Sequence, residues 1–342
     1  MTAGRAGPPP GVDPRRLAAY LRALPGEPVL EAVELIDGGR SNLTFSLATS
    51  AGPLVLRRPP LGDVAPSAND VGREYRVMRA LRGSTVPVPR TVALCTDLAV
   101  IGAPFSLVEK VTGRVLRHPA DVAALHAAQA RAVVESLVGH LVALHRVDVD
   151  AVGLGGLGRP AGFVARQVER WQAQRDHVAT RPLPAADELY RRLRRRVPAG
   201  GAGSLVHGDY RLDNVMVDAV DPGRIVAVLD WEMTTLGDPL TDLGLLLVYR
   251  EPECGPVLPH GNPFGGSPHV PTADDIARRY GDLSGRPLDD LGFYRALGCF
   301  KLAVIAEGIH GRHLAGLTAG SGFDSVGDAV EALLHRGLEL VS

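Results

Sequence analysis

The stretch from Leu205 to Glu232, LVHGDYRLDNVMVDAVDPGRIVAVLDWE, constrains the fold and chemistry of this 342-residue chain more than any other. Its polar cluster His207-Gly208-Asp209 is followed five positions later by Asn214. Two apolar runs around an Asp-Pro-Gly turn occupy 215–229 and predict a β-hairpin. A hairpin would fold Asp230 back beside Asn214 and Asp209. Carboxylate and amide oxygens that meet in this way suit a hard divalent cation.

The order Asp-x-x-x-x-Asn, with a second Asp after a hairpin, is the order found in kinase catalytic loops. In those loops the first Asp accepts the proton of the acceptor hydroxyl, and the Asn and the later Asp hold Mg²⁺ on the phosphates. These roles fall on Asp209, Asn214 and Asp230, with His207 and Arg211 as further candidate catalytic residues. The alternative is that the acids only form turns and a strand-end cap, but three residues agree in type and order.

The residue between His207 and Asp209 is glycine, where protein kinases usually have arginine. Together with the later LDWE, GDP (237–239) and DLG (242–244), this motif resembles the aminoglycoside phosphotransferase and choline kinase group. The segments LVLRRPP (54–60) and FKLAVIAEGI (300–309) resemble the branch of that family associated with acyl-CoA dehydrogenases. The resemblance implies an α+β, two-lobed kinase-like fold: a five-stranded antiparallel sheet with one helix, then a mainly helical lobe.

The expected domain organisation follows this resemblance. Residues 1–12 are rich in Gly and Pro and are expected to form a disordered tail. The N-lobe, which would cover the nucleotide phosphates, is placed at 13–108 and the hinge at 109–113. Residues 114–342 would form the helical C-lobe with the catalytic loop and the acceptor site.

A glycine-rich turn at 37–42 lies between two expected strands. Gly39 permits a close approach of the backbone to phosphate, and Ser41 and Asn42 offer hydrogen-bond donors. Most Gly-Gly hairpins are only turns. The resemblance nevertheless implies that this turn contacts the phosphates of ATP.

Kinases place a phosphate-pairing lysine near the end of the third strand, whereas this chain has Arg57 and Arg58. We expect Arg57 to pair with phosphate and take Arg58 as the second choice; the sequence leaves this choice open. Glu74, on a helix expected at 68–81, would hold Arg57 as in the kinase strand–helix ion pair. The alternative for these three side chains is a set of solvated surface charges.

Two further nucleotide contacts are assigned by position in the resemblance alone. Glu109 and Val111 follow the fifth expected strand, where kinases contact adenine through main-chain N–H and C=O groups. Main-chain contacts place no constraint on side chains, so the residues themselves give no independent evidence for adenine binding.

Composition narrows the function classes. The net charge of −1 gives no basis for broad binding to nucleic acid or to a membrane surface. The three cysteines form no disulfide or zinc pattern, which favours a reducing cytoplasm. We find no signal peptide at the N-terminus and no apolar run of the ~18 residues that a membrane span needs.

The sequence therefore predicts a Mg²⁺- and ATP-dependent kinase that phosphorylates a small-molecule hydroxyl. The alternatives are an inactive nucleotide-binding pseudokinase, an antibiotic phosphotransferase and, least favoured, a nucleic-acid-binding module.

An aminoglycoside acceptor calls for an acidic cleft, but the loop at 250–271 has only two acids. The branch resemblance implies a hydroxyacyl-CoA or a related metabolite instead. Candidate acceptor contacts are Lys301, Glu307, Arg312 and the arginines near Arg194, with plain surface positions as the alternative.

Overall fold

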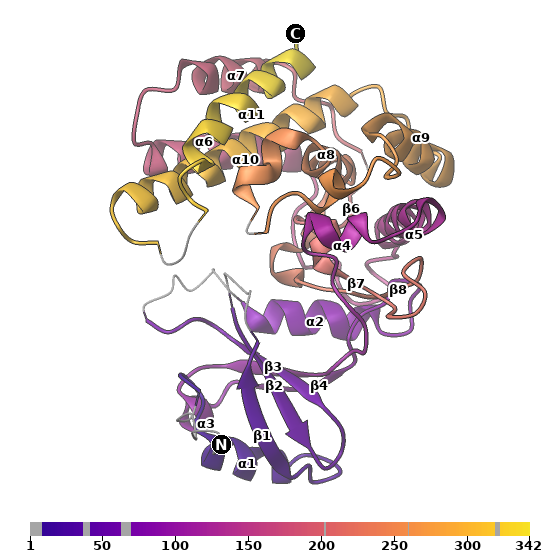
Figure 1. The fold of residues 1–342 in the computed structure, drawn as a ribbon, viewed down its shortest axis with the longest axis vertical. Helices are drawn as coiled ribbons and strands as arrows, with labels where there is room; N and C mark the ends of the chain where they lie inside the picture. Colours follow the sequence, from indigo (N-terminus) through magenta and orange to yellow (C-terminus); the bar gives the residue numbers. More distant parts are fainter. Residues whose placement is uncertain (1–8, 37–41, 63–69, 202, 259, 319–321) are drawn as a thin grey trace. The chain divides into compact units, whose positions relative to one another are not determined.

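The structure is a computed structural model that describes residues 9–36, 42–62, 70–201, 203–258, 260–318 and 322–342. The chain forms two compact units, whose elements are labelled in Figure 1. Unit 1 comprises Met1–Thr112 and Leu229–Glu232, and unit 2 comprises Gly113–Val228 and Met233–Ser342.

Unit 1 is built on a five-stranded antiparallel sheet with the order β1-β2-β3-β5-β4. Its strands are β1 Leu30–Leu35, β2 Leu43–Thr49, β3 Leu54–Arg58, β4 Thr91–Cys95 and β5 Phe105–Glu109. Alternating side chains of β2 and β3 are buried, as the period of two in a half-buried strand requires. The expected five-stranded sheet is therefore confirmed.

The described part of unit 1 contains three helices: α1 (Pro14–Arg22), α2 (Val71–Leu81) and α3 (Leu98–Ile101). Asp13 caps α1 by accepting from the backbone N–H groups of its first turn, and Asp70 caps α2 in the same way. Helix α2 packs on β4 and β5, and α1 packs on β1 and α3. The sequence predicted α2, expected at 68–81, whereas the single-turn α3 was not expected.

Unit 2 is mainly helical and is organised around α10, which contacts α6, α7, α8 and α11. Its helices are α4 Pro119–Ala123, α5 Ala127–His145, α6 Phe163–Val178, α7 Pro184–Arg195, α8 Leu240–Tyr249, α9 Ala273–Ser284, α10 Leu291–Leu314 and α11 Val326–Leu340. Helix α10 has apolar side chains around most of its circumference, as expected for a buried helix. None of the helices in the described part of the chain is long and apolar enough to cross a bilayer.

The segment 204–237, which follows α7, contains two short pairs of β-strands. Strand β6 (Ser204–Val206) pairs with β9 (Thr235–Gly237), and β7 (Val215–Val217) pairs with β8 (Ile225–Val228), all antiparallel. The second pair is the hairpin that the sequence predicted.

The region at 250–271, expected to be a plain loop, contains two 3₁₀ turns, Pro252–Val257 and Pro263–Gly266.

Candidate active site

The catalytic-loop candidate leaves β6 through a glycine that no other residue could replace without strain. Gly208 has φ +85°, and a Cβ added to it would lie 2.8 Å from the backbone oxygen of Met233. Positive φ disfavours residues with a side chain, and the close backbone approach leaves no room for one. The loop that carries Asp209 therefore depends on glycine at this position.

The carboxylate of Asp209 is fixed from both of its oxygens. The hydroxyl of Tyr249 donates to Oδ1 at 2.6 Å, while Oδ2 accepts from Asn214 Nδ2 at 3.1 Å and pairs with Arg211 Nε at 3.2 Å. Burial would raise the pKa of Asp209, but the charges of Arg211 and Lys301 outweigh it and hold that pKa below its usual value. The side chain is thus a charged, oriented acceptor that is still 23% exposed.

Asn214 is oriented by Asp209, at the end of a 3₁₀ turn (Leu212–Asn214) that leads into β7. Its Nδ2 donates to the backbone oxygen of Asp209 at 2.8 Å and to the Asp209 carboxylate. Since Nδ2 faces Asp209, the amide Oδ1 remains as an oxygen donor of the kind Mg²⁺ prefers. Within the described ranges no group of three or more His, Cys, Asp or Glu side chains could hold a metal. A site built from one amide, one carboxylate and substrate phosphates is of the type expected for Mg²⁺.

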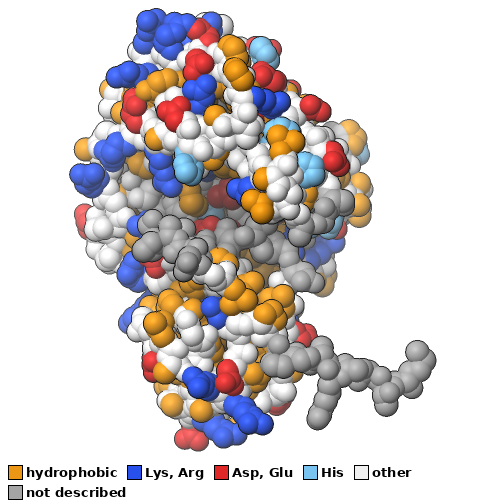
Figure 2. Space-filling view, turned by 90° about the vertical axis from the view of Figure 1, so that its left-hand side faces the viewer, with side chains coloured by type: hydrophobic (Ala, Val, Ile, Leu, Met, Phe, Trp, Pro, Cys, Tyr) orange, Lys and Arg blue, Asp and Glu red, His pale blue; other side chains and the backbone are white. Residues whose placement is uncertain are grey.

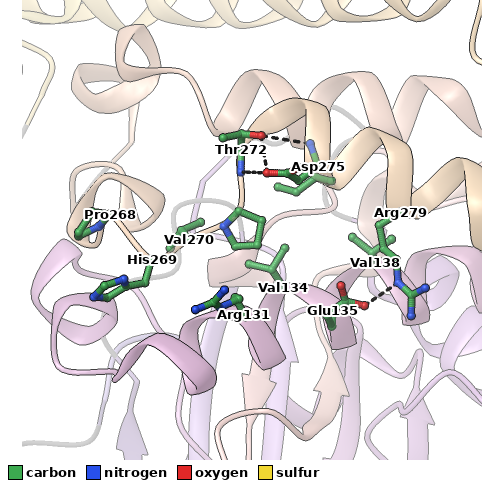
Figure 3. Close-up of a pocket in the computed structure, with 12 residues that line it drawn as sticks. Arg131, Val134, Glu135, Val138, Pro268, His269, Val270, Thr272, Asp275 and Arg279 are labelled. Carbon is green, nitrogen blue, oxygen red and sulfur yellow. Dashed lines mark hydrogen bonds and ion pairs between the residues drawn. The ribbon is translucent and has the colours of Figure 1, made fainter.

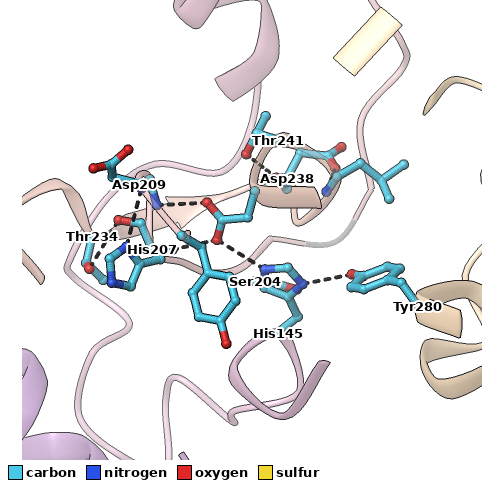
Figure 4. A network of polar contacts seen from close by, with 12 residues as sticks. His145, Ser204, His207, Asp209, Thr234, Asp238, Thr241 and Tyr280 are labelled. Atoms are coloured by element: carbon cyan, nitrogen blue, oxygen red, sulfur yellow. Dashed lines mark hydrogen bonds and ion pairs between the residues drawn. The ribbon is translucent and has the colours of Figure 1, made fainter. Parts of the chain in front are cut away.

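A buried polar network beneath the loop holds its backbone (Figure 4). Asp242, in the first turn of α8, accepts from the N–H groups of His207 at 2.6 Å and Gly208 at 2.8 Å. The ring of His145 bridges Asp242 Oδ2 at 3.2 Å and the hydroxyl of Tyr280 at 2.8 Å. His207 itself is fully buried and accepts from the N–H of Asp209. This geometry suits a positioning role for His207 rather than contact with a substrate.

Replacing Asp242 by Asn should destabilise unit 2, in a pH-dependent way. Burial would raise the pKa of Asp242, but hydrogen bonding and charge from His145, with His207, hold it below the usual value. A depressed folded-state pKa means that this stabilisation is present above the usual Asp pKa and is lost as pH falls through the folded value. We expect Asp242→Asn to lower the free energy of unfolding by about 1–3 kcal/mol near neutral pH, and by less in acid.

Urea denaturation of wild type and Asp242→Asn at neutral and acid pH measures this difference. Asp274→Asn, an exposed change on α9, is the control and should have little effect at either pH. An Asp242→Asn deficit of the same size at both pH values would show that the charge of Asp242 is not what stabilises the loop.

Lys301, near the centre of α10, contacts the backbone of the catalytic-loop candidate. Its Nζ donates to the backbone oxygen of Gly208 at 2.7 Å and lies 5.6 Å from the centre of the Trp171 ring. Burial lowers the pKa of Lys301, and the charges of Asp209 and Asp242 oppose that change. Two basic side chains, Arg211 and Lys301, therefore lie next to Asp209, and Arg211 also pairs with Asp213 at 3.1 Å.

The second cluster lies in unit 1 and joins β3 to α2. Arg57 donates to buried Glu74 at 2.7 Å and pairs with Asp230 at 3.5 Å. Asp230 has φ +66°, an uncommon conformation for a residue with a side chain and one that often marks a functional position. The structure therefore brings together Arg57, Glu74 and Asp230. Because Asp230 clusters with unit 1, its proximity to Asn214 stays a prediction.

The two adjacent arginines of β3 point to different surroundings. Arg58 is 5% exposed and donates to the backbone oxygens of Pro59, Gly11 and Ile101, so its guanidinium anchors the chain around the sheet. Successive residues of a strand face opposite sides of the sheet, which explains why only Arg57 reaches Glu74. This arrangement favours Arg57 over Arg58 as the phosphate-pairing residue.

Substitutions of the two arginines should separate nucleotide binding from stability. We expect Arg57→Lys to keep more nucleotide affinity than Arg57→Ala, because a cation remains beside Glu74. Arg58→Ala should instead lower the free energy of unfolding by about 1–3 kcal/mol, since backbone acceptors lose their donor. ADP titration of folded protein and urea melts distinguish the two effects. If folded Arg58→Ala loses ADP affinity and Arg57→Ala keeps the affinity of wild type, Arg58 is the phosphate-pairing residue instead of Arg57.

Of the glycine-rich turn, only Asn42 lies within the described residues; Gly39 and Ser41 lie outside them. Asn42 is 3% exposed, and its Nδ2 donates to Glu232 Oε2 at 3.3 Å. The side-chain amide is thus directed at the segment that follows Asp230. Phosphate contacts of this turn remain a prediction.

At the end of β5 the expected hinge residues are present with partly exposed side chains. The N–H of Glu109 donates to the backbone oxygen of Arg90 at 2.9 Å, and its side chain pairs with the Arg90 guanidinium. Val111 is half-buried two residues later. Adenine contacts at Glu109 and Val111 are not shown by this geometry and remain expectations.

The late-helix candidates differ from one another. Glu307 is 1% exposed and accepts from the backbone N–H of Thr180 at 3.0 Å, which makes it a support for the α6–α7 connection. Arg312 is exposed near the end of α10. Lys301 alone among the three contacts the catalytic-loop candidate.

The arginine run of α7 lies on a mixed-charge surface. Figure 2 shows basic and acidic side chains interspersed at the end of unit 2 that includes α7. Arg191 and Arg192 both pair with Glu188, and Arg194 pairs with Glu169. This pairing fits the solvated-face interpretation of the run.

A cavity of about 600 Å³ lies elsewhere in unit 2, between α5, the segment 268–272 and α9 (Figure 3). Its lining includes Val134 and Val138 of α5, Val270, Ile276 of α9, and the Glu135–Arg279 ion pair. None of the expected site residues lines this cavity. We therefore do not take it as the reaction site.

Comparison with known proteins identifies the family. The pattern of the phosphotransferase enzyme family matches residues 32–282. The chain belongs to this family. Acyl-CoA dehydrogenase family member 11 of Gallus gallus is 35% identical over 96% of this chain and 43% of its own length. The phosphotransferase chain thus spans less than half of that curated relative.

Solved structures of the family show the same fold. A Ralstonia eutropha crystal structure, assigned by its name to the aminoglycoside phosphotransferases, has a TM-score of 0.82 and 34% identity, covering 96% of this chain and 98% of that one. The ternary complex of aminoglycoside phosphotransferase APH(4)-Ia with ADP and hygromycin B has a TM-score of 0.61 and 16% identity, covering 96% and 97%. The kinase-like fold and the family resemblance that the sequence predicted are confirmed, and the fold supports kinase-type phosphoryl transfer and the use of ATP.

Proposed function

We propose that this phosphotransferase transfers the γ-phosphoryl group of MgATP to a hydroxyl group of a small molecule. The observation that supports this most is the geometry of Asp209. Its carboxylate is held from both oxygens and is partly exposed, and nearby Arg211 and Lys301 hold its pKa below the usual value, which suits a general base for a hydroxyl.

In the proposed reaction, the hydroxyl donates to Asp209 while its oxygen approaches the γ-phosphorus. The new O–P bond forms as the bond from the γ-phosphorus to the β–γ bridging oxygen breaks. The proton passes to Asp209, and ADP leaves with the electron pair. Arg211 and Lys301 keep Asp209 charged before the transfer.

Asn214 and Asp230 are the proposed ligands of Mg²⁺. When bound, Mg²⁺ would offset negative charge on the phosphates. Asn214 Nδ2 is directed at Asp209, and Asp230 pairs with Arg57. These contacts orient both side chains before any ligand binds.

The remaining nucleotide contacts are proposed for unit 1. Arg57, held by Glu74, would pair with the α- and β-phosphates through its planar guanidinium. The turn with Gly39, Ser41 and Asn42 would cover the phosphates, and main-chain groups of Glu109 and Val111 would contact adenine.

For the acceptor we propose an anionic hydroxyl compound, specifically a hydroxyacyl-CoA or a related metabolite, rather than an aminoglycoside. Lys301 beside the loop supports this, because its positive charge favours an anionic acceptor over a polycationic antibiotic. The relatives named acyl-CoA dehydrogenase family member are matched over less than half of their length, so their names do not identify the acceptor of this chain. Exposed Arg312 and the arginines near Arg194 are candidate contacts for the phosphates of coenzyme A.

An ADP-release screen tests the function. Purified protein is incubated with MgATP and a panel of hydroxyacyl-CoA thioesters, free hydroxy acids, sugars and aminoglycosides. We expect release with at least one anionic hydroxyl compound and none with Asp209→Asn. ATP binding without turnover on any acceptor would favour the pseudokinase instead. Turnover only with aminoglycosides would overturn the acceptor class.

A further inference from the structure

Tyr249 is the one group of α8 that reaches the reacting carboxylate. It is the last residue of α8, is 5% exposed, and its hydroxyl lies 2.6 Å from Asp209 Oδ1. Burial, with the charge of Asp209, raises the pKa of Tyr249 well above its usual value. The hydroxyl therefore stays protonated and acts as the donor in this hydrogen bond.

The geometry leaves one direction open on Asp209. An ionised carboxylate can accept about four hydrogen bonds, two on each oxygen. Oδ2 accepts from Asn214 Nδ2 and forms an ion pair with the Arg211 guanidinium, whereas Oδ1 accepts from Tyr249 alone. Oδ1 therefore keeps a lone pair next to the Tyr249 hydroxyl. Tyr249 thereby determines where an incoming hydroxyl can donate.

Helix α8 holds the catalytic loop at two points. Asp242 and Tyr249 are seven residues apart, which is about two helical turns, so their side chains lie on the same face. Asp242 binds the backbone of His207 and Gly208, and Tyr249 binds the side chain of Asp209. The Arg211 guanidinium also lies 5.3 Å from the centre of the Tyr249 ring, which fixes the ring in turn.

We propose that Tyr249 is a positioning residue of phosphoryl transfer: its hydroxyl fixes the carboxylate plane of Asp209 so that the free lone pair of Oδ1 faces the acceptor. This inference rests on the proposed function. Without the hydroxyl, the carboxylate can turn about its broad terminal torsion, and the acceptor hydroxyl loses its defined partner. Nucleotide binding uses other residues and should not change.

The test compares Tyr249→Phe with Tyr294→Phe, using MgATP and whichever compound of the screen gives the fastest ADP release. Tyr294 is a matched control, since it is 3% exposed and donates to the Asp238 carboxylate at 2.8 Å, away from Asp209. Both variants lose one buried tyrosine hydroxyl, so similar losses of stability are expected. For Tyr249→Phe we expect kcat to fall about 10–100-fold with an unchanged KM for ATP, as small misplacements of reacting groups commonly cause. Tyr294→Phe should keep the kcat of wild type.

Each other outcome is decisive. If wild type releases ADP but Tyr249→Phe matches the kcat of Tyr294→Phe, the positioning role is wrong and the proposed function stands. A rise in KM for ATP with unchanged kcat would also overturn the positioning role. If wild type releases no ADP with any compound, the proposed function fails, and this inference falls with it.

Discussion

Asp209→Asn should abolish phosphoryl transfer and leave nucleotide binding nearly intact. The amide cannot accept the proton of the acceptor hydroxyl, and a general base typically contributes about 10²–10⁴-fold to the rate. Arg211 and Lys301 would also lose the negative charge that they face. ADP release and ADP titration on the same preparation separate the two effects.

The control for Asp209→Asn is Asp213→Asn. Asp213 is an acid of the same loop and pairs with Arg211 at 3.1 Å. The side-chain nitrogen of Asn214 donates to Asp209 instead. Asp213→Asn should leave most of the turnover in place, because Asp213 is not directed at an acceptor in the proposed reaction. Wild-type turnover in Asp209→Asn would show that Asp209 is not the base.

The second large effect is expected at Asp230. Asp230→Ala should weaken binding of MgATP far more than binding of metal-free ATP, because only the metal-bound nucleotide needs the carboxylate. The backbone at φ +66° complicates this variant, since alanine tolerates that conformation poorly. Asp230→Asn is therefore the better comparison, because Asn is the residue after Gly that best adopts a left-handed conformation.

Isothermal titration of both Asp230 variants with ATP, with and without Mg²⁺, measures the metal-specific loss. Arg57 loses its second carboxylate partner in Asp230→Ala, so some loss with metal-free ATP is expected as well. An equal loss in the two titrations would mean that Asp230 acts through Arg57 alone and is not a metal ligand.

Local patterns were sufficient to predict most of the fold. The β7–β8 hairpin follows from two apolar runs around an Asp-Pro-Gly turn, and the structure shows it within the expected 215–229. The five-stranded sheet that the family resemblance implied is also present. The β6–β9 pair was missed because its strands are three residues each and about 30 residues apart, so no local pattern links them. Helix α11 was not predicted, because its packing on α10 has no local signature.

The residues of the candidate site also fall into those that local sequence patterns predict and those that only the folded structure brings together. The catalytic-loop acids are recognisable because their order and spacing are local. Arg57 and Arg58 could not be separated by sequence, since adjacent basic residues of a strand differ only in which face they occupy. Tyr249 and His145 were missed because their partners, Asp209 and Asp242, are 40 and 97 residues away in the chain. Their contacts arise only from the packing of α5 and α8 beneath the loop.

The most direct test of the proposed function is to follow the γ-phosphorus of ATP itself. Wild-type protein is incubated with γ-labelled MgATP and the best compound of the screen, and the products are separated and identified by mass spectrometry. The proposed function predicts that the label appears as a phosphate monoester on the hydroxyl of that compound, in equal amount to the ADP formed, and that Asp209→Asn yields none. Label found only as inorganic phosphate, or ATP that binds and is never consumed, would contradict it.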